Sequence, residues 1–166
     1  MILNINIPKN RLKIANDCIN EILSYLKDIK IQHSFNSFLI EGENILNVYK
    51  AYNILLAIAR GFKKEDAMLL LKDEYKIDII PIEAYVKSRN RQIALKGRVI
   101  GEGGKTKNWI EKRTNTKISI YGKTIGIIGS SMNVEIAKEV IEMLLKGSKH
   151  STAYKNLEQR IKSLIP

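Results

Sequence analysis

An internal repeat constrains the fold of this chain more than any other feature of its sequence. Residues 47–61 align without gaps on residues 133–147, at an offset of 86 positions. In both copies apolar side chains recur at helical spacing, and a glycine follows a basic residue, as is common at the C-terminal end of a helix. A match of this length at a fixed offset predicts that one structural unit is duplicated.

The segments that precede each copy of this helix also correspond. Each unit opens with an apolar stretch that runs into a proline, at Pro8 and at Pro81. Two further short strands are then expected in each unit: Ile29–Ile31 and Ser37–Ile40 in the first, and Thr116–Ile118 and Thr124–Ile128 in the second. The pattern predicts two units of the order strand–helix–strand–strand–helix, with a break near residues 73–76.

The two units differ in the helical part between their first and second strands. The stretch from Ile7 to Lys30 spans 23 residues, whereas the corresponding stretch from Ile80 to Lys117 spans 37. The shorter stretch contains no glycine and predicts one amphipathic helix over residues 9–27. The longer stretch contains Gly97, Gly101, Gly103 and Gly104, and it predicts a helix, a tight glycine turn and a second helix. Residues 64–72 predict a short connecting helix, and residues 151–163 a final helix that packs on the body.

Positive charge is concentrated around the glycine turn. The whole chain has a formal net charge of +11. From Lys87 to Lys123 eleven basic side chains stand against two acidic ones, which leaves +9 in that stretch and +2 in the other 129 residues. Such a concentration indicates a polyanionic partner. Nucleic acid fits better than an anionic membrane surface, because the charges flank a glycine turn and do not form the polar face of an apolar amphipathic helix.

Composition argues against several other classes of protein. The single cysteine, Cys18, cannot form an intramolecular disulfide, and with two distant histidines it gives no zinc-ligand spacing. The longest apolar run, Ile54–Ala59, is far shorter than the roughly 20 residues that cross a bilayer. No secretory signal, nucleophile–base pair or carboxylate dyad is visible. We therefore expect a cytoplasmic protein with no metal, no cofactor, no membrane segment and no enzyme activity.

The glycine turn departs from two nucleotide-binding motifs. A P-loop needs a glycine five residues before its Gly-Lys-Thr, and that position is Val99. A dinucleotide-binding loop that began at Gly101 would need another glycine where Thr106 stands. A nucleotide-dependent enzyme that uses residues 101–106 is therefore the least favoured alternative.

A glycine turn at the start of a helix suits a phosphate backbone. The turn exposes backbone N–H groups, and the positive end of the helix favours anions. Phosphates can approach these amides closely because glycine has no side chain. Lys105 and Lys107 lie in the first turn of the following helix, where lysine opposes the helix dipole. We therefore expect both lysines, together with Arg98, to contact phosphate.

The segment Ile100-Gly101-x-x-Gly104 resembles the signature loop of a type I KH domain, and the order β–α–α–β–β–α of the second unit fits type I and not type II. The resemblance implies an α+β fold with two tandem type I KH-like units, of which the first is degenerate and lacks the GxxG loop, plus a C-terminal helix. The expected ranges are residues 1–74, 75–147 and 148–166. In KH domains this loop clamps the backbone of about four unpaired nucleotides.

The resemblance also implies a groove for the bases between the first two helices of the second unit and its second strand. Val99, Ile100, Ile110, Ile118 and Ile120 would form the apolar floor of this groove. The complete set expected to bind RNA is Gly97, Arg98, Val99, Ile100, Gly101, Glu102, Gly103, Gly104, Lys105, Thr106, Lys107, Ile110, Ile118 and Ile120. Trp109 is expected in the core or the groove wall, and not as a stacking platform for a base.

A wider resemblance rests on the hairpin Tyr121-Gly-Lys-Thr124, on Ile127-Ile-Gly129 and on the ending Leu145-Lys-Gly-Ser-Lys-His150. With the two KH-like units, these segments are similar to the archaeal counterpart of the eukaryotic small-subunit assembly factor called Dim-two or partner of Nob, which is related to the Krr family. The resemblance implies binding near the 3′ end of small-subunit rRNA, beside a PIN-domain endonuclease. A general KH adaptor in RNA decay or translation is the alternative. Residues 1–74 lack the glycine loop that archaeal relatives keep, so we expect them to serve packing or protein docking.

Overall fold

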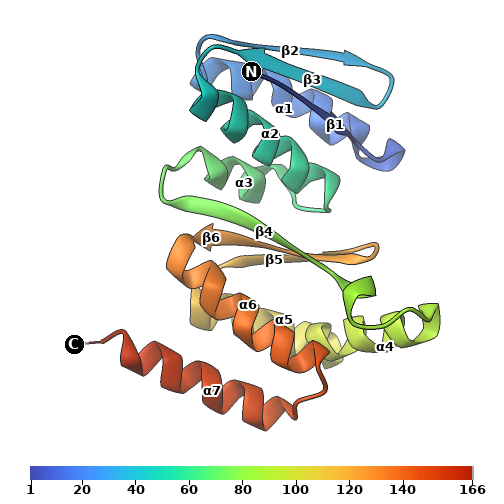
Figure 1. The fold of residues 1–166 in the computed structure, drawn as a ribbon, viewed down its shortest axis with the longest axis vertical. Helices are drawn as coiled ribbons and strands as arrows, with labels where there is room; N and C mark the ends of the chain where they lie inside the picture. The colour runs from blue at the N-terminus through green and yellow to red at the C-terminus, as the bar shows by residue number, and fades with distance from the viewer. Residues whose placement is uncertain (166) are drawn as a thin grey trace. The chain divides into compact units, whose positions relative to one another are not determined.

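In the computed structural model, which describes residues 1–165, the chain forms two compact units, Met1–Tyr75 and a second unit that begins at Lys76 (Figure 1). Each unit has a three-stranded sheet with helices against one of its faces. The predicted α+β fold with two KH-like units and a C-terminal helix is confirmed. Among the described residues no helix is long and apolar enough to cross a membrane.

The first unit has one helix between its first two strands. Its elements are β1 (Ile2–Asn6), α1 (Leu12–Tyr25), β2 (Ile29–Ser34), β3 (Ser37–Gly42), α2 (Ile45–Ala59) and α3 (Lys64–Ala67). The strand order is β1-β3-β2, and both pairs are antiparallel. Phe38 and Ile40 of β3 are fully buried because alternate residues of a strand face the same side. In α1 the buried residues Ala15, Cys18 and Ile22 recur at helical spacing and face inward.

The second unit contains a pair of helices at the corresponding place. Its elements are β4 (Tyr75–Pro81), α4 (Arg89–Ile100), α5 (Lys105–Thr114), β5 (Lys117–Tyr121), β6 (Thr124–Ser130), α6 (Ser131–Leu145) and α7 (His150–Ser163). The strand order is β4-β6-β5, so β5 is an edge strand that pairs antiparallel with β6. The predicted helix–glycine turn–helix arrangement is therefore confirmed, with the turn at residues 101–104.

The C-terminal helix is an integral part of the second unit. Ala153 and Leu157 of α7 are buried in the same apolar core as Ile127 of β6 and Leu144 of α6. Figure 1 shows α7 running alongside α6, with which it is in contact. An ion pair between Arg160 and Glu139, with Nε and Oε2 3.1 Å apart, joins the two helices at the surface. The prediction that this helix packs on the body of the protein is confirmed.

Candidate nucleic-acid interface

The glycine loop between α4 and α5 has a backbone conformation that favours glycine. Gly101, Gly103 and Gly104 have φ angles of 75°, 62° and 79°. The N–H of Gly104 donates to the carbonyl of Gly101 at 3.1 Å and closes the turn. A Cβ on Gly101 would collide with the Thr106 hydroxyl, whereas a Cβ on Gly103 would meet no atom within 4 Å. Gly101 is therefore fixed by packing, and Gly103 faces open space.

The two lysines after the loop have different surroundings. Lys105 is exposed, and no carboxylate of the described chain lies within ion-pair distance of its ammonium group. Lys107 is partly buried, and its Nζ lies 3.2 Å from Oε1 of Glu111. A phosphate beside Lys107 would have to share this ammonium group with Glu111, whereas Lys105 is available without such competition.

Arg98 is engaged inside the protein. Its guanidinium donates to the backbone carbonyl of Ser148, and its Nε is buried with no hydrogen-bond partner among the described residues. The Arg98 carbonyl accepts a hydrogen bond from Nε2 of His150 at 2.9 Å. A side chain held to the connector before α7 cannot reach a phosphate without breaking this contact. The expected contact between Arg98 and phosphate therefore disagrees with its position in the structure. Arg98 instead supports the loop by binding the connector before α7.

Thr106 is also turned inward, contrary to the expectation that it contacts RNA. Its side chain is 4% exposed, and its Oγ1 accepts a hydrogen bond from the Tyr154 hydroxyl at 3.1 Å. In a P-loop the corresponding hydroxyl binds a magnesium ion, which requires an open site. The burial of Thr106 thus argues against a nucleotide site at residues 101–106.

The residues expected to form the groove floor divide into two groups. Val99 and Ile110 are fully buried and Ile118 is 4% exposed, so these three belong to the core. They can support a groove from below, but they offer no surface to a base. Ile100 and Ile120 are half-buried and keep exposed apolar surface. Direct contact with a base stays a prediction for these two residues.

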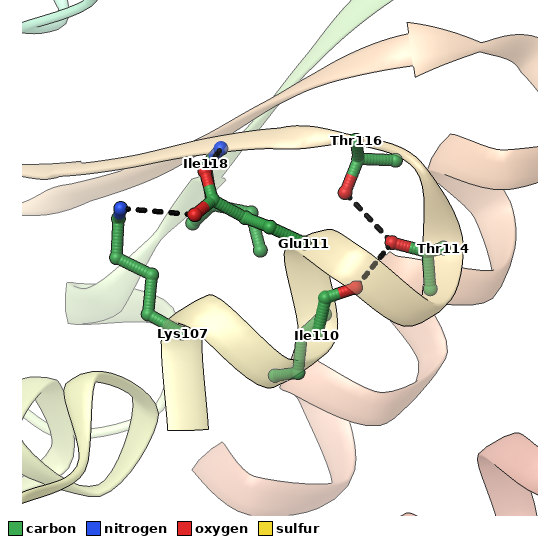
Figure 2. A network of polar contacts seen from close by, with 6 residues as sticks. All are labelled: Lys107, Ile110, Glu111, Thr114, Thr116 and Ile118. Carbon is green, nitrogen blue, oxygen red and sulfur yellow. Dashed lines mark hydrogen bonds and ion pairs between the residues drawn. The ribbon is translucent and has the colours of Figure 1, made fainter. Parts of the chain in front are cut away.

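The outer edge of β5 faces α5, and Figure 2 shows the polar contacts between them. Oε2 of Glu111 accepts a hydrogen bond from the backbone N–H of Ile118 at 2.9 Å, while Oε1 faces Lys107. Thr114 donates to the carbonyl of Ile110 and lies 2.7 Å from the hydroxyl of Thr116, which closes the turn from α5 into β5. The start of β5 is therefore held to α5 by side chains.

The contact from Glu111 also shows which backbone groups of β5 point outward. Because the Ile118 N–H points away from β6, the N–H and carbonyl of Ile120 point to the same outer edge. An edge strand offers such unpaired groups as a template for hydrogen bonding. The polar edge of a base can bind there in the same way.

A cluster of basic residues continues this edge at the tip of the β5–β6 hairpin. A cavity of about 490 Å³ is lined there by Lys87, Arg89 and Lys96 on the side of α4, and by Gly122 and Lys123 of the hairpin. Nζ of Lys96 donates to the carbonyl of Gly122 at 2.8 Å and so links the two sides. The cavity has room for one nucleotide by volume. Four basic side chains suit this lining to phosphate, but Glu83 also lines the cavity, and its Oε2 lies 3.9 Å from Nζ of Lys123, so a phosphate there would compete with this carboxylate.

The charge of the two units differs strongly. Residues 1–75 contain ten basic and nine acidic side chains, a net charge of +1, whereas residues 76–166 contain eighteen and eight, a net charge of +10. In the first unit α1 is continuous from Leu12 to Tyr25 and no glycine loop interrupts it. Both the loop and the charge needed for a polyanion therefore lie in the second unit.

Sequence reasoning missed two contributors to this site. Glu111 could have been found as the i+4 partner of Lys107, but its bond to Ile118 depends on how α5 meets β5. The helix over residues 151–163 was expected only to pack on the body, so the bond from its Tyr154 to Thr106 was missed. Trp109 lies in the wall of the core as predicted, and there it packs against the ring of Tyr154.

Among residues 1–165 no three His, Cys, Asp or Glu side chains gather as metal ligands would.

Comparison with protein families gives a match over most of the second unit. The family model described as "Eukaryotic type KH-domain (KH-domain type I)", which represents the second such domain of PNO1, matches residues 76–162. A KH domain-containing protein from Methanocaldococcus jannaschii is 48% identical over 114 residues, which cover 69% of this chain and 50% of that protein. The pre-rRNA-processing protein pno1 of Schizosaccharomyces pombe is 34% identical over 110 residues, which cover 65% and 46%. The chain thus spans about half the length of these curated relatives.

A solved structure extends the similarity to both units. A chain in the crystal structure of the a/eIF2α–aDim2p–rRNA complex from Pyrococcus horikoshii superposes with a TM-score of 0.88 at 35% identity. The superposition covers 98% of this chain and 95% of that one. The similarity includes the first unit, which the family model does not reach.

Proposed function

The chain belongs to the PNO1 family of type I KH proteins, and from this membership we propose that its second unit binds single-stranded RNA during the maturation of ribosomal RNA. One observation carries the proposal: the open glycine loop lies in the most basic stretch of the chain, next to the half-buried surface of Ile100. The names of the similar proteins support rRNA as the class of ligand, since one is a pre-rRNA-processing protein and another belongs to a complex with rRNA.

The chemistry of the proposed site divides between the two parts of a nucleotide. The amide of Gly103 and the ammonium of Lys105 bind the phosphates without regard to sequence, whereas the amide of Gly104 is used inside the turn. Ile100 and Ile120 supply apolar contact for the bases, and the outward N–H and carbonyl of Ile120 hydrogen-bond to one base edge. An unpaired strand fits this arrangement, because the bases of a duplex are stacked and cannot turn toward β5.

We also propose the finer features that the family resemblance implies. The RNA is the 3′ region of small-subunit rRNA, the protein acts in the cytoplasm beside a PIN-domain endonuclease, and it has no catalytic activity of its own. The first unit supplies protein contacts, a role that its near-neutral charge supports. Binding to a twelve-nucleotide RNA of the rRNA 3′ end, compared with a scrambled RNA of the same composition, tests this proposal. Equal affinity for the two would favour a general KH adaptor in RNA decay or translation.

The test of the loop itself is the double substitution Glu102→Asp with Gly103→Asp. Aspartate tolerates the positive φ of Gly103, and a side chain there has open space, so the fold should survive. Two carboxylates at the loop tip repel phosphate, and we expect RNA binding to fall below detection in fluorescence anisotropy. Asn36→Asp, at an exposed hairpin position of the first unit, adds one negative charge elsewhere and should leave the affinity unchanged. Unchanged affinity in the double variant would refute the role of the loop.

Salt dependence provides a second measure of phosphate contacts. The logarithm of the affinity for a single strand should fall with the logarithm of the salt concentration, with a slope of about −0.7 per phosphate neutralised. Lys123→Ala should reduce this slope by about 0.7 if the basic cavity at the hairpin tip holds a phosphate.

Titration with ATP and GTP in a calorimeter should give no heat of binding. A saturable heat would instead favour the nucleotide-dependent alternative.

A further inference from the structure

The connector before α7 is attached to the helix that enters the glycine loop. Arg98 lies three residues before Gly101, and its guanidinium donates to the carbonyl of Ser148. In return His150, the first residue of α7, donates from Nε2 to the carbonyl of Arg98 at 2.9 Å. The last turn of α4 is thus held by two hydrogen bonds to residues at or just before the start of α7.

Helix α5, which follows the loop, is also attached to α7. Thr106, two residues after Gly104, accepts the hydrogen bond of the Tyr154 hydroxyl at 3.1 Å. The same Thr106 side chain fills the space next to Gly101, where a Cβ would collide with it. Tyr154 therefore holds the rotamer of the Thr106 side chain, which packs against the first glycine of the loop.

Further contacts continue along α5. The rings of Trp109 and Tyr154 have their centroids 4.1 Å apart, and the guanidinium of Arg113 binds both carboxylate oxygens of Glu158 at 2.6 Å. Thr106, Trp109 and Arg113 follow at spacings of three and four residues, so they share one face of α5. Lys107 and Glu111 lie on another face, which is turned toward β5. The contacts to α7 therefore leave the side next to β5 free.

A loop of glycines loses more conformational entropy than other residues when it becomes fixed. A binding site whose donors are already in place binds more tightly than one that must order them on binding. We propose that α7 acts as a brace which holds the glycine loop in its binding geometry, and that Tyr154 is its central positioning residue. The inference rests on the proposed RNA binding, and it makes α7 part of the RNA-binding module without a contact to RNA.

The test is the substitution Tyr154→Phe, which removes the hydrogen bond to Thr106 and keeps the ring against Trp109. We expect the amides of residues 102–105 to exchange their hydrogens at least 5-fold faster, because the loop opens locally. We expect the affinity for a mixed-sequence twelve-nucleotide single-stranded RNA to fall about 3- to 10-fold, with the salt slope unchanged, since no phosphate contact is lost. Thr106→Val should give a similar loss, and both substitutions together little more than either alone.

Tyr85→Phe is the matched control. Its hydroxyl donates to Oε2 of Glu142 at 3.0 Å, also between side chains of the second unit, but away from the loop. It should leave both the amide exchange of residues 102–105 and the affinity unchanged. Wild-type exchange and affinity in Tyr154→Phe, or equal losses in Tyr85→Phe, would overturn the brace. If the wild-type protein does not bind RNA, the proposed function fails, while the exchange rates still decide whether α7 holds the loop.

Discussion

The carboxylate of Glu111 accepts a hydrogen bond from the backbone N–H of Ile118 at 2.9 Å. An acidic side chain thus occupies the first outward donor on the edge of β5, within the most basic stretch of the chain. Lys107 faces the other oxygen of this carboxylate at 3.2 Å and balances its charge. The next outward donor, at Ile120, has no such partner among the side chains of the described residues, so the groove is open at Ile120 and closed at Ile118.

Glu111→Gln should therefore affect stability and binding in different ways. The amide oxygen can still accept from Ile118, so the free energy of unfolding should change by no more than about 1 kcal/mol. The loss of a negative charge near the phosphates should raise the affinity for RNA several-fold. Glu139→Gln removes a carboxylate from the exposed surface of α6 and is the control for net charge. A drop in affinity with Glu111→Gln would mean that the carboxylate itself binds a base.

Two glycine substitutions should differ in their cost. Gly103→Ala places a Cβ near the left-handed helical region, at φ 62° and ψ 20°, at a cost of about 1–2 kcal/mol. Gly101→Ala should cost roughly 1–3 kcal/mol more, because its Cβ collides with Thr106 and because its angles, φ 75° and ψ 169°, are adopted almost only by glycine. The free energies of unfolding from urea titration give the comparison. Equal values for the two variants would contradict the close packing of Gly101 against Thr106.

The thiol of Cys18 should be inert in the folded protein. Burial raises the pKa of this thiol to about 11, and its side chain has no exposed surface. At pH 8 the reactive thiolate is therefore scarce and inaccessible. We expect one thiol to react with Ellman's reagent in 6 M guanidinium chloride, and less than about a hundredth of that rate in buffer. A fast reaction in buffer would show that α1 is not packed as described.

The ion pair between Arg113 and Glu158 predicts a dependence of stability on acid. Arg113 lowers the pKa of Glu158 below its ordinary value of 4.5. A carboxyl whose pKa is lowered by folding contributes stability above the ordinary value, and this contribution is lost as the pH falls through the pKa of the folded state. Glu158→Gln should therefore lower the melting temperature at pH 7 and converge with the wild type at low pH. Parallel curves from pH 7 to pH 3 would show that the pair adds nothing.

Much of this fold could be predicted from the sequence, because the information is local or repeated. The repeat of residues 47–61 at 133–147 reports two copies of one unit, and the elements of both copies follow from apolar periodicity. The glycine turn at residues 101–104 was recognisable because glycine is required by its backbone angles. Each of these inferences needs only a pattern along the sequence, with no knowledge of which distant residues meet in space.

The destinations of individual side chains could not be predicted in the same way. Arg98 and Thr106 flank the loop in sequence, so Arg98 was expected to contact phosphate and Thr106 to contact RNA, but each is bound to a residue about fifty positions away. Their partners, Ser148 and Tyr154, are brought there by the packing of α7, which no pattern around the loop encodes. Val99 and Ile110 were expected on the floor of a groove because of the resemblance to KH domains, and their burial places them beneath that floor.

The most direct measurement is a titration of the ¹⁵N-labelled protein with an unpaired twelve-nucleotide RNA from the small-subunit rRNA 3′ end, followed through its backbone amide resonances. We predict that the largest shifts occur at Gly103, Gly104, Lys105 and Ile120, and that the amides of residues 1–74 change little. Large shifts confined to the first unit, or no shifts at the glycine loop under saturating RNA, would contradict the role of this loop as the RNA-binding site.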